Sequence, residues 1–142
     1  MAKKKWGQHF LKSKSIAESI VQTADVKYGD HIMEIGPGYG ILTEALLNFS
    51  AKVTAIEIDP DLCAKLLKKF EKESNFTLLE QDVMKIESNE FEKLIKFPAK
   101  LVSNLPYNIA TSILLKLLPV RKTWESFTVM VQLEVGERLC AI

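Results

Sequence analysis

Short apolar runs of strand length alternate with amphipathic helical segments along most of this chain of 142 residues. Strands separated by helices of about ten residues are typical of right-handed crossovers within a parallel sheet. We therefore expect an α/β fold whose parallel sheet is covered by helices on both faces. The predicted strands are 31–35, 52–56, 76–79, 100–103 and 127–131. The predicted helices are 16–24, 41–49, 60–70, a short one capped by Ser88, 109–118 and one that begins at 134.

Composition places the chain among ordinary globular domains, with 47% apolar and 26% charged residues. The two cysteines, Cys63 and Cys140, can make no disulfide framework and do not stand at metal-ligand spacing with either histidine. We therefore expect a cytoplasmic protein without a bound metal. No apolar stretch has the length of a secretory signal or a membrane span, so we expect no membrane association.

The first 17 residues carry five lysines and no acid, while the net charge of the whole chain is only +1. These residues are Lys3, Lys4, Lys5, Lys12 and Lys14. Mobile ammonium groups bind a nucleic acid backbone by displacing its counterions, so the segment can be an RNA-binding arm. A solvated tail has the same composition, and charge alone does not separate the two interpretations.

A glycine-rich turn follows the first predicted strand, where Glu34 precedes Gly36, Gly38 and Gly40. Glycines at this position let the backbone approach a ligand beside the N–H groups that begin the next helix. The spacing is GxGxG, whereas the dinucleotide fingerprint needs GxGxxG to seat a pyrophosphate. The turn alone is also compatible with a purely structural role.

Acidic residues follow the second and third predicted strands, at the edge where doubly wound sheets bind ligands. Glu57 can accept hydrogen bonds from both ribose hydroxyls, and Asp82 from the amine of an adenine packed between Ile58 and Val83. We infer S-adenosylmethionine as the cofactor. NAD is the competitor, although no proton-transfer residue stands at a strand end for hydride chemistry. Taken singly, either acid can be a solvated side chain or a helix cap.

The fourth predicted strand ends in Asn104-Leu105-Pro106-Tyr107. The Asn104 side-chain carbonyl and the Leu105 backbone carbonyl can accept both hydrogens of an aromatic amine, which directs its lone pair toward a methyl donor. Pro106 holds the backbone extended, and Tyr107 offers a face for a stacked base. The alternative is a turn in which Asn104 caps the following helix.

These motifs together resemble the ribosomal RNA adenine N6 dimethyltransferases, in the family's order and over nearly the whole chain. The bacterial small-subunit type, associated with kasugamycin sensitivity, is the most similar. The resemblance is carried by 5–11 (KWGQHFL), 34–43, 57–59 (EID), 81–83 (QDV), 104–107 (NLPY) and 131–135 (VQLEV). His9 stands where many members have asparagine.

The resemblance implies a Rossmann-like class I S-adenosylmethionine methyltransferase fold and assigns roles to single residues. His9 and Leu11 would close over the cofactor, Gly36 would lie beneath its methionine part, and Asn104 would touch both cofactor and target. The implied reaction is dimethylation of two adjacent adenines near the 3′ end of small-subunit (16S) ribosomal RNA, during ribosome biogenesis. The expected partner is the small ribosomal subunit, and the full-length protein is expected to be a monomer.

The resemblance also divides the chain into a basic arm (1–14) that closes over the cofactor and a catalytic domain (15–142). Family members continue with two further strands and a small helical domain, so we expect truncation after the fifth strand. This piece would then keep the cofactor pocket but methylate subunits poorly. Two other functions fit the same motifs: a non-catalytic RNA-binding assembly factor, and a large-subunit methylase that confers macrolide resistance.

Overall fold

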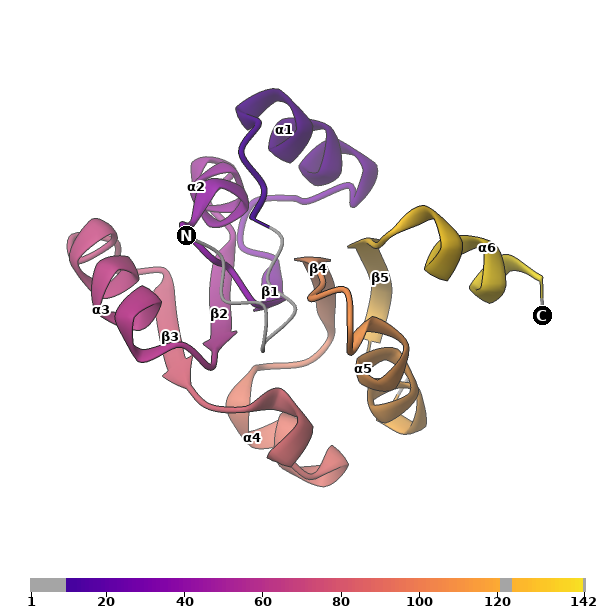
Figure 1. The fold of residues 1–142 in the computed structure, drawn as a ribbon. Helices are drawn as coiled ribbons and strands as arrows, with labels where there is room; N and C mark the ends of the chain where they lie inside the picture. The colour runs from indigo at the N-terminus through magenta and orange to yellow at the C-terminus, as the bar shows by residue number, and fades with distance from the viewer. Residues whose placement is uncertain (1–9, 121–123, 142) are drawn as a thin grey trace.

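The computed structural model describes residues 10–120 and 124–141. Five parallel strands form one sheet in the order β3-β2-β1-β4-β5. Figure 1 shows the strands side by side, with helices above and below them. The strands are β1 (His31–Ile35), β2 (Lys52–Glu57), β3 (Phe76–Glu80), β4 (Ala99–Asn104) and β5 (Trp124–Met130). The predicted α/β architecture is confirmed.

The described residues also form six α-helices and three short 3₁₀ turns. The helices are α1 (Lys14–Thr23), α2 (Ile41–Asn48), α3 (Pro60–Lys69), α4 (Phe91–Leu94), α5 (Ala110–Leu117) and α6 (Leu133–Cys140). The 3₁₀ turns are η2 (Val83–Lys85), η3 (Ser88–Glu90) and η4 (Leu118–Val120). None of the described helices is long and apolar enough to cross a membrane.

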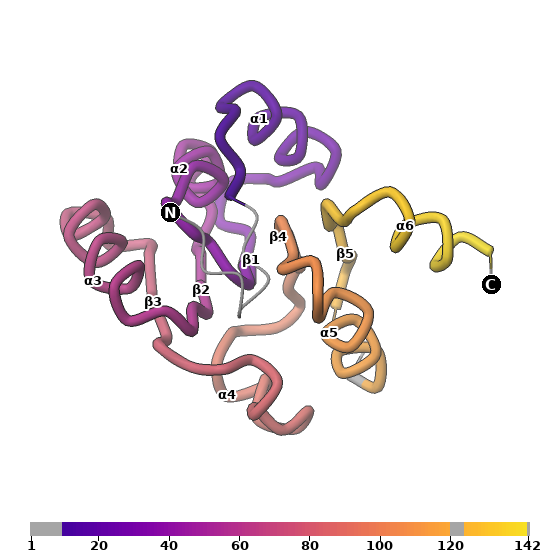
Figure 2. The backbone as a smooth tube through the Cα atoms, in the orientation of Figure 1, coloured from indigo at the N-terminus to yellow at the C-terminus, as the bar shows by residue number. Residues whose placement is uncertain are grey.

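Two apolar clusters hold the helices to the two faces of the sheet, because successive side chains of a strand point to opposite faces. On one face, Ile32 and Val53 pack with α1 and α2. On the other, Met33 and Leu101 pack with α4 and α5. The tube in Figure 2 follows the same division, with α1 and α2 on one side and α4 and α5 on the other.

Helix starts follow local capping chemistry. Ser13 caps α1 by accepting a hydrogen bond from the Ile16 N–H (3.2 Å), and Asp59 caps α3 with Pro60 in its first turn. The prediction that Ser88 caps the short helix before β4 is wrong. The Ser88 hydroxyl instead donates to the Lys116 carbonyl (3.1 Å), while the carboxylate of Glu90 accepts from the N–H of Glu87 (3.1 Å).

β5 begins three residues earlier than the predicted start at 127, and it ends at Met130. Glu125 and Ser126 interrupt the run of apolar residues that would predict a strand. The structure accommodates this break with a register shift, in which Ala99 pairs with Trp124 and Lys100 pairs with Ser126. Glu125 is left out of the ladder as in a β-bulge.

A buried lysine joins three elements at the edge of the sheet where β1 and β4 begin. The ammonium group of Lys100 donates to the Asp25 carbonyl (2.7 Å) and to the Asp30 carboxylate (2.9 Å), and it lies 3.9 Å from Glu125. Burial alone would raise the pKa of Asp30, but the hydrogen bonds from Lys100 and from the Lys27 backbone lower it below 3.8.

Lys100→Met should lower the free energy of unfolding by roughly 2 kcal/mol at pH 7, because it leaves the Asp30 carboxylate without its cation. Since the pKa of Asp30 is lowered in the folded state, the pair stabilises the fold fully above pH 3.8 and loses this effect as pH falls further. Urea denaturation from pH 7 to pH 3 should therefore show that the free energies of unfolding of Lys100→Met and wild type come closer together at the acidic end. A difference that is constant across this range would contradict the assignment.

Candidate active site

The carboxyl ends of β1 and β4 meet at the centre of the sheet. β1 pairs directly with β4, and the Ile35 N–H donates to the Ser103 hydroxyl at 2.7 Å. A Cβ built on Gly36 would lie 3.3 Å from the ring of Pro106, so the glycine turn and the segment after β4 are in close contact. Asn104 and Gly36 therefore border the same hollow.

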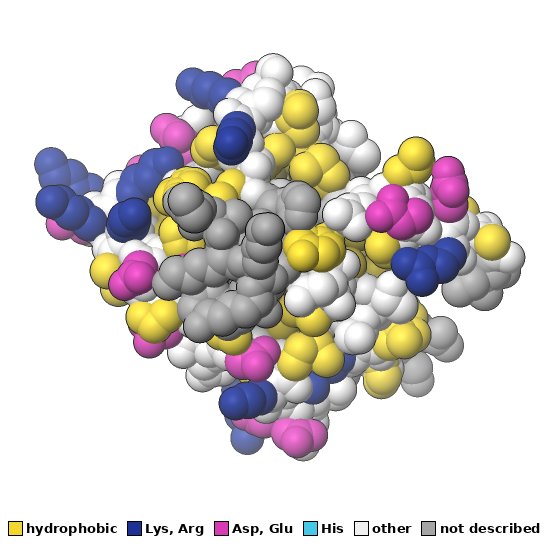
Figure 3. All heavy atoms as spheres, in the orientation of Figure 1, with side chains coloured by type: hydrophobic (Ala, Val, Ile, Leu, Met, Phe, Trp, Pro, Cys, Tyr) yellow, Lys and Arg dark blue, Asp and Glu magenta, His cyan; other side chains and the backbone are white. Residues whose placement is uncertain are grey.

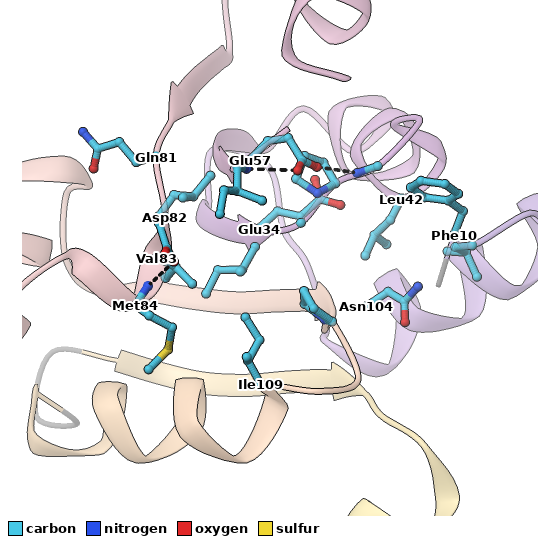
Figure 4. Close-up of a pocket in the computed structure, with 18 of the residues that line it drawn as sticks. Phe10, Glu34, Leu42, Glu57, Gln81, Asp82, Val83, Met84, Asn104 and Ile109 are labelled. Carbon is cyan, nitrogen blue, oxygen red and sulfur yellow. Dashed lines mark hydrogen bonds between the residues drawn. The ribbon is translucent and has the colours of Figure 1, made fainter. Parts of the chain in front are cut away.

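A cavity of about 210 Å³ opens at this edge of the sheet. It collects side chains from four strand ends: Glu34, Glu57, Asp82 and Asn104. In Figure 4, Asp82 and Asn104 lie on opposite sides of the hollow, with Glu34 between them. The strand ends thus converge on one site, as parallel pairing requires.

Most of the predicted cofactor residues line this cavity, namely Leu11, Gly36, Gly38, Glu57, Ile58, Asp82, Val83 and Asn104, with Pro106 beside them. Leu105 and Tyr107 line an adjoining groove instead. His9 and the lysines at positions 3, 4 and 5 lie outside the described residues.

Glu57 holds the glycine turn to the end of β2. One carboxylate oxygen accepts from the Gly38 N–H (3.2 Å), and the other accepts from the N–H groups of Ile58 (3.0 Å) and Asp59 (3.1 Å). Burial raises the pKa of Glu57, and these three hydrogen bonds oppose the rise. The carboxylate therefore shapes the cavity wall as well as lining it.

Asp82 both caps a helical turn and borders the cavity. Its carboxylate accepts from the Met84 N–H (3.0 Å) and caps η2, as the dashed line in Figure 4 marks. The same side chain lines the cavity opposite Asn104. A cap of this kind fixes the direction of the carboxylate and leaves it further lone pairs for a ligand amine.

Phe10 is a site residue that the sequence prediction missed. Its ring lies 4.5 Å from that of Tyr39, centroid to centroid, and it covers Gly38 so closely that a Cβ there would lie 2.8 Å from the ring. Gly38 also has φ +60°, which favours glycine for a second reason. The signal in the sequence was the position of Phe10 between His9 and Leu11; its contact with the glycine turn was not readable there.

Glu34 is a buried carboxyl group in the cavity floor, with 1% of its surface exposed. Burial raises its pKa to about 8; the hydrogen bond from the Thr43 hydroxyl opposes this, and the nearby Glu57 adds to it. The group is therefore protonated at neutral pH in the folded chain.

The parallel sheet, the glycine turn after β1, the acid that ends β2 and the acid just beyond β3 define the Rossmann-like class I fold of S-adenosylmethionine methyltransferases. Two solved structures agree with this class. The 23S rRNA methyltransferase ErmE has a TM-score of 0.76 and 30% identity, and the alignment covers 90% of this chain and 50% of that one. A dimethyladenosine transferase from Plasmodium falciparum has a TM-score of 0.77 and 32% identity, with 94% and 47% covered.

The chain belongs to the ribosomal RNA adenine dimethylase family, whose model matches residues 1–142. Relatives named ribosomal RNA small subunit methyltransferase A include one from Crocosphaera subtropica, 40% identical over 98% of this chain and 54% of the relative. One from Clostridium botulinum is 41% identical over 97% and 50%. The chain thus spans about half the length of the curated relatives it matches.

Glu34→Gln should change how stability depends on pH. Because the folded-state pKa of Glu34 is about 8, its protonated form stabilises the fold fully below pH 4.5, and this stability is lost as pH rises toward 8. The free energy of unfolding of wild type should therefore fall steadily between pH 5 and 7.5 because of this group. In urea denaturation at several pH values, the free energy of unfolding of Glu34→Gln should not fall in this way. Glu71→Gln, at an exposed position, is the matched control, and parallel curves for wild type and Glu34→Gln would contradict the prediction.

Proposed function

We propose that this chain is the cofactor-binding catalytic part of an enzyme that dimethylates N6 of two adjacent adenines in small-subunit (16S) ribosomal RNA, with S-adenosylmethionine as methyl donor. The observation that carries the proposal is the position of Asn104 at the cavity wall, beside the Gly36 turn. An amine bound by Asn104 then faces a ligand bound above the turn. Family membership and the names of the relatives support the same reaction.

The cavity offers groups for the parts of a nucleoside cofactor. Buried Ile56 and Val83 and partly buried Ile58 give apolar walls for a planar base. We assign Glu57 to the ribose hydroxyls and Asp82 to the adenine amine, since both carboxylates border the cavity. Gly36 and Gly38 let the methionine part approach the backbone. When bound, the cofactor supplies an electrophilic methyl group on sulfur.

The residues after β4 prepare the target amine. The Asn104 side-chain carbonyl and the Leu105 backbone carbonyl accept its two hydrogens, which weakens conjugation of the nitrogen lone pair with the ring. A hydrogen bond from the Leu105 N–H to the Met130 carbonyl (3.1 Å) anchors this segment to β5. Pro106 restricts the backbone, and Tyr107 offers its ring to the target base. No general base is needed, because the nitrogen becomes acidic only after methylation.

We also propose that residues 1–14 form an arm over the cofactor, in which His9 and Leu11 close the cavity, and that residues 15–142 form the catalytic domain. The contact of Phe10 with Gly38 and Tyr39 supports this assignment, since it brings the arm onto the glycine turn. Leu11 borders the cavity as well. The basic residues Lys3, Lys4 and Lys5 are assigned to RNA phosphates.

We prefer a small-subunit methylase over the two alternatives, a large-subunit methylase and a non-catalytic assembly factor. The relatives named small subunit methyltransferase A are about 40% identical, whereas the large-subunit enzyme ErmE is 30% identical. The presence of Asn104, Leu105, Pro106 and Tyr107 at the cavity and its adjoining groove favours an enzyme over a non-catalytic assembly factor. We place the activity in the cytoplasm, on the small ribosomal subunit, with a monomeric full-length protein.

Asn104→Ala should reduce methyl transfer at least about 100-fold, because the target amine loses an acceptor that acts at the reacting atom. The test uses labelled S-adenosylmethionine and unmethylated 30S subunits with the full-length protein, and cofactor binding is measured separately by calorimetry. RNA affinity should persist in the variant. The 142-residue chain should bind cofactor but transfer methyl groups poorly. Methylation by Asn104→Ala at the wild-type rate would reject the proposed mechanism, and the matched control is Asn75→Ala in the loop before β3.

Alanine at Lys3, Lys4 and Lys5 together should weaken RNA binding and flatten its salt dependence by up to about one log-log unit per lost phosphate contact. The measurement is RNA affinity at several salt concentrations. Cofactor affinity serves as the control for folding. An unchanged slope would assign these lysines to a solvated tail.

A further inference from the structure

A second groove of about 410 Å³ adjoins the cofactor cavity. It lies where the segment before α1 meets the carboxyl ends of β4 and β5. Phe10, Leu11 and Asn104 line both hollows, whereas Tyr107 lines only the groove. The two hollows therefore meet at the residue that we assign to the target amine.

The groove has the composition of a surface for single-stranded nucleic acid. Its apolar wall includes Ile16, Met130 and Val131, and its polar groups include Lys12 and Gln132. Within the part of the chain that the structure describes, its lining contains no acidic side chain. Flat apolar bases with a negatively charged backbone match such a surface, because stacking and phosphate neutralisation act together.

Ile16 is conspicuous in this setting because it is a large apolar side chain that is 45% exposed. It lies in the first turn of α1, and α1 contacts β5. Figure 3 shows hydrophobic side chains exposed over α1 on the face that is drawn. A ligand in the groove would cover Ile16 and lie between α1 and the end of β5.

We infer that this groove binds the nucleotides adjoining the target adenine in a single RNA strand, with Lys12 at a phosphate, Ile16 and Met130 against a base face, and Gln132 at a base edge. The inference rests on the proposed function and extends it from the reacting base to its neighbours. RNA is favoured over a protein segment because the groove is continuous with Asn104 and carries Lys12 without an opposing acid. An RNA strand that presents a base to Asn104 must continue past this site in at least one direction.

The decisive experiment compares Ile16→Glu with Ile16→Lys. The exposed position of Ile16 makes both compatible with folding, and they differ only in the sign of the charge that faces the RNA. Fluorescence anisotropy would follow a labelled single-stranded hexanucleotide that contains two adjacent adenines, in the presence of saturating S-adenosylhomocysteine. Ile16→Glu should bind at least about tenfold more weakly than Ile16→Lys. Leu67→Glu and Leu67→Lys, at a 56% exposed position on α3, are the matched controls and should differ less than twofold.

Lys12→Gln gives an independent measurement, since loss of one phosphate contact should flatten the salt dependence by about 0.7 log-log units for a single strand. Equal affinities of the two Ile16 variants, or no RNA binding by the unchanged chain, would overturn the inference. Either outcome would leave the proposed function standing if the full-length protein still bound cofactor and transferred methyl groups normally. If the unchanged chain bound no cofactor, the proposed function and this inference would both fail.

Discussion

The pairing of β1 with β4 is the contact on which the site depends. These strands are distant in sequence, yet they are neighbours in the sheet, and the Ile35 N–H to Ser103 hydroxyl hydrogen bond joins their carboxyl ends. Because both strands point the same way, the Gly36 turn and the Asn104 segment emerge at one edge. A register slip of one residue would turn Asn104 to the opposite face of the sheet. Apolar packing on both faces prevents such a slip.

Contacts from three parts of the chain hold the glycine turn in place. Glu57 accepts from its Gly38 N–H at the end of β2, Phe10 covers Gly38 from the segment before α1, and Pro106 lies against Gly36 from the segment after β4. Each contact comes from a different part of the chain, so the turn is fixed only when the whole sheet edge has formed. The cavity is therefore a property of the assembled fold.

Much of this could be predicted from the sequence, because strand and helix periodicities are local and the glycine turn and the Asn104 motif stand at strand ends. The inferred chemistry required Asn104 beside Gly36, and hence β1 beside β4, but the order of the remaining strands was not predicted. The start of β5 was not, because the bulge at Glu125 depends on pairing with β4. The Ser88 cap was predicted wrongly, since Glu87 and Glu90 satisfy that turn between themselves. The packing of Phe10 on Gly38 is a contact between separate segments that no local pattern records.

The Lys100 cluster has a consequence for how this fold tolerates change. It joins Asp25, Asp30 and Glu125 where β1 and β4 begin, whereas the cavity lies where they end. Its charges are thus one strand length from the cavity. Substitutions in the cluster can change thermal tolerance without touching the cavity at the opposite end of the strands, so adaptation to temperature can proceed through positions separate from those that line the site.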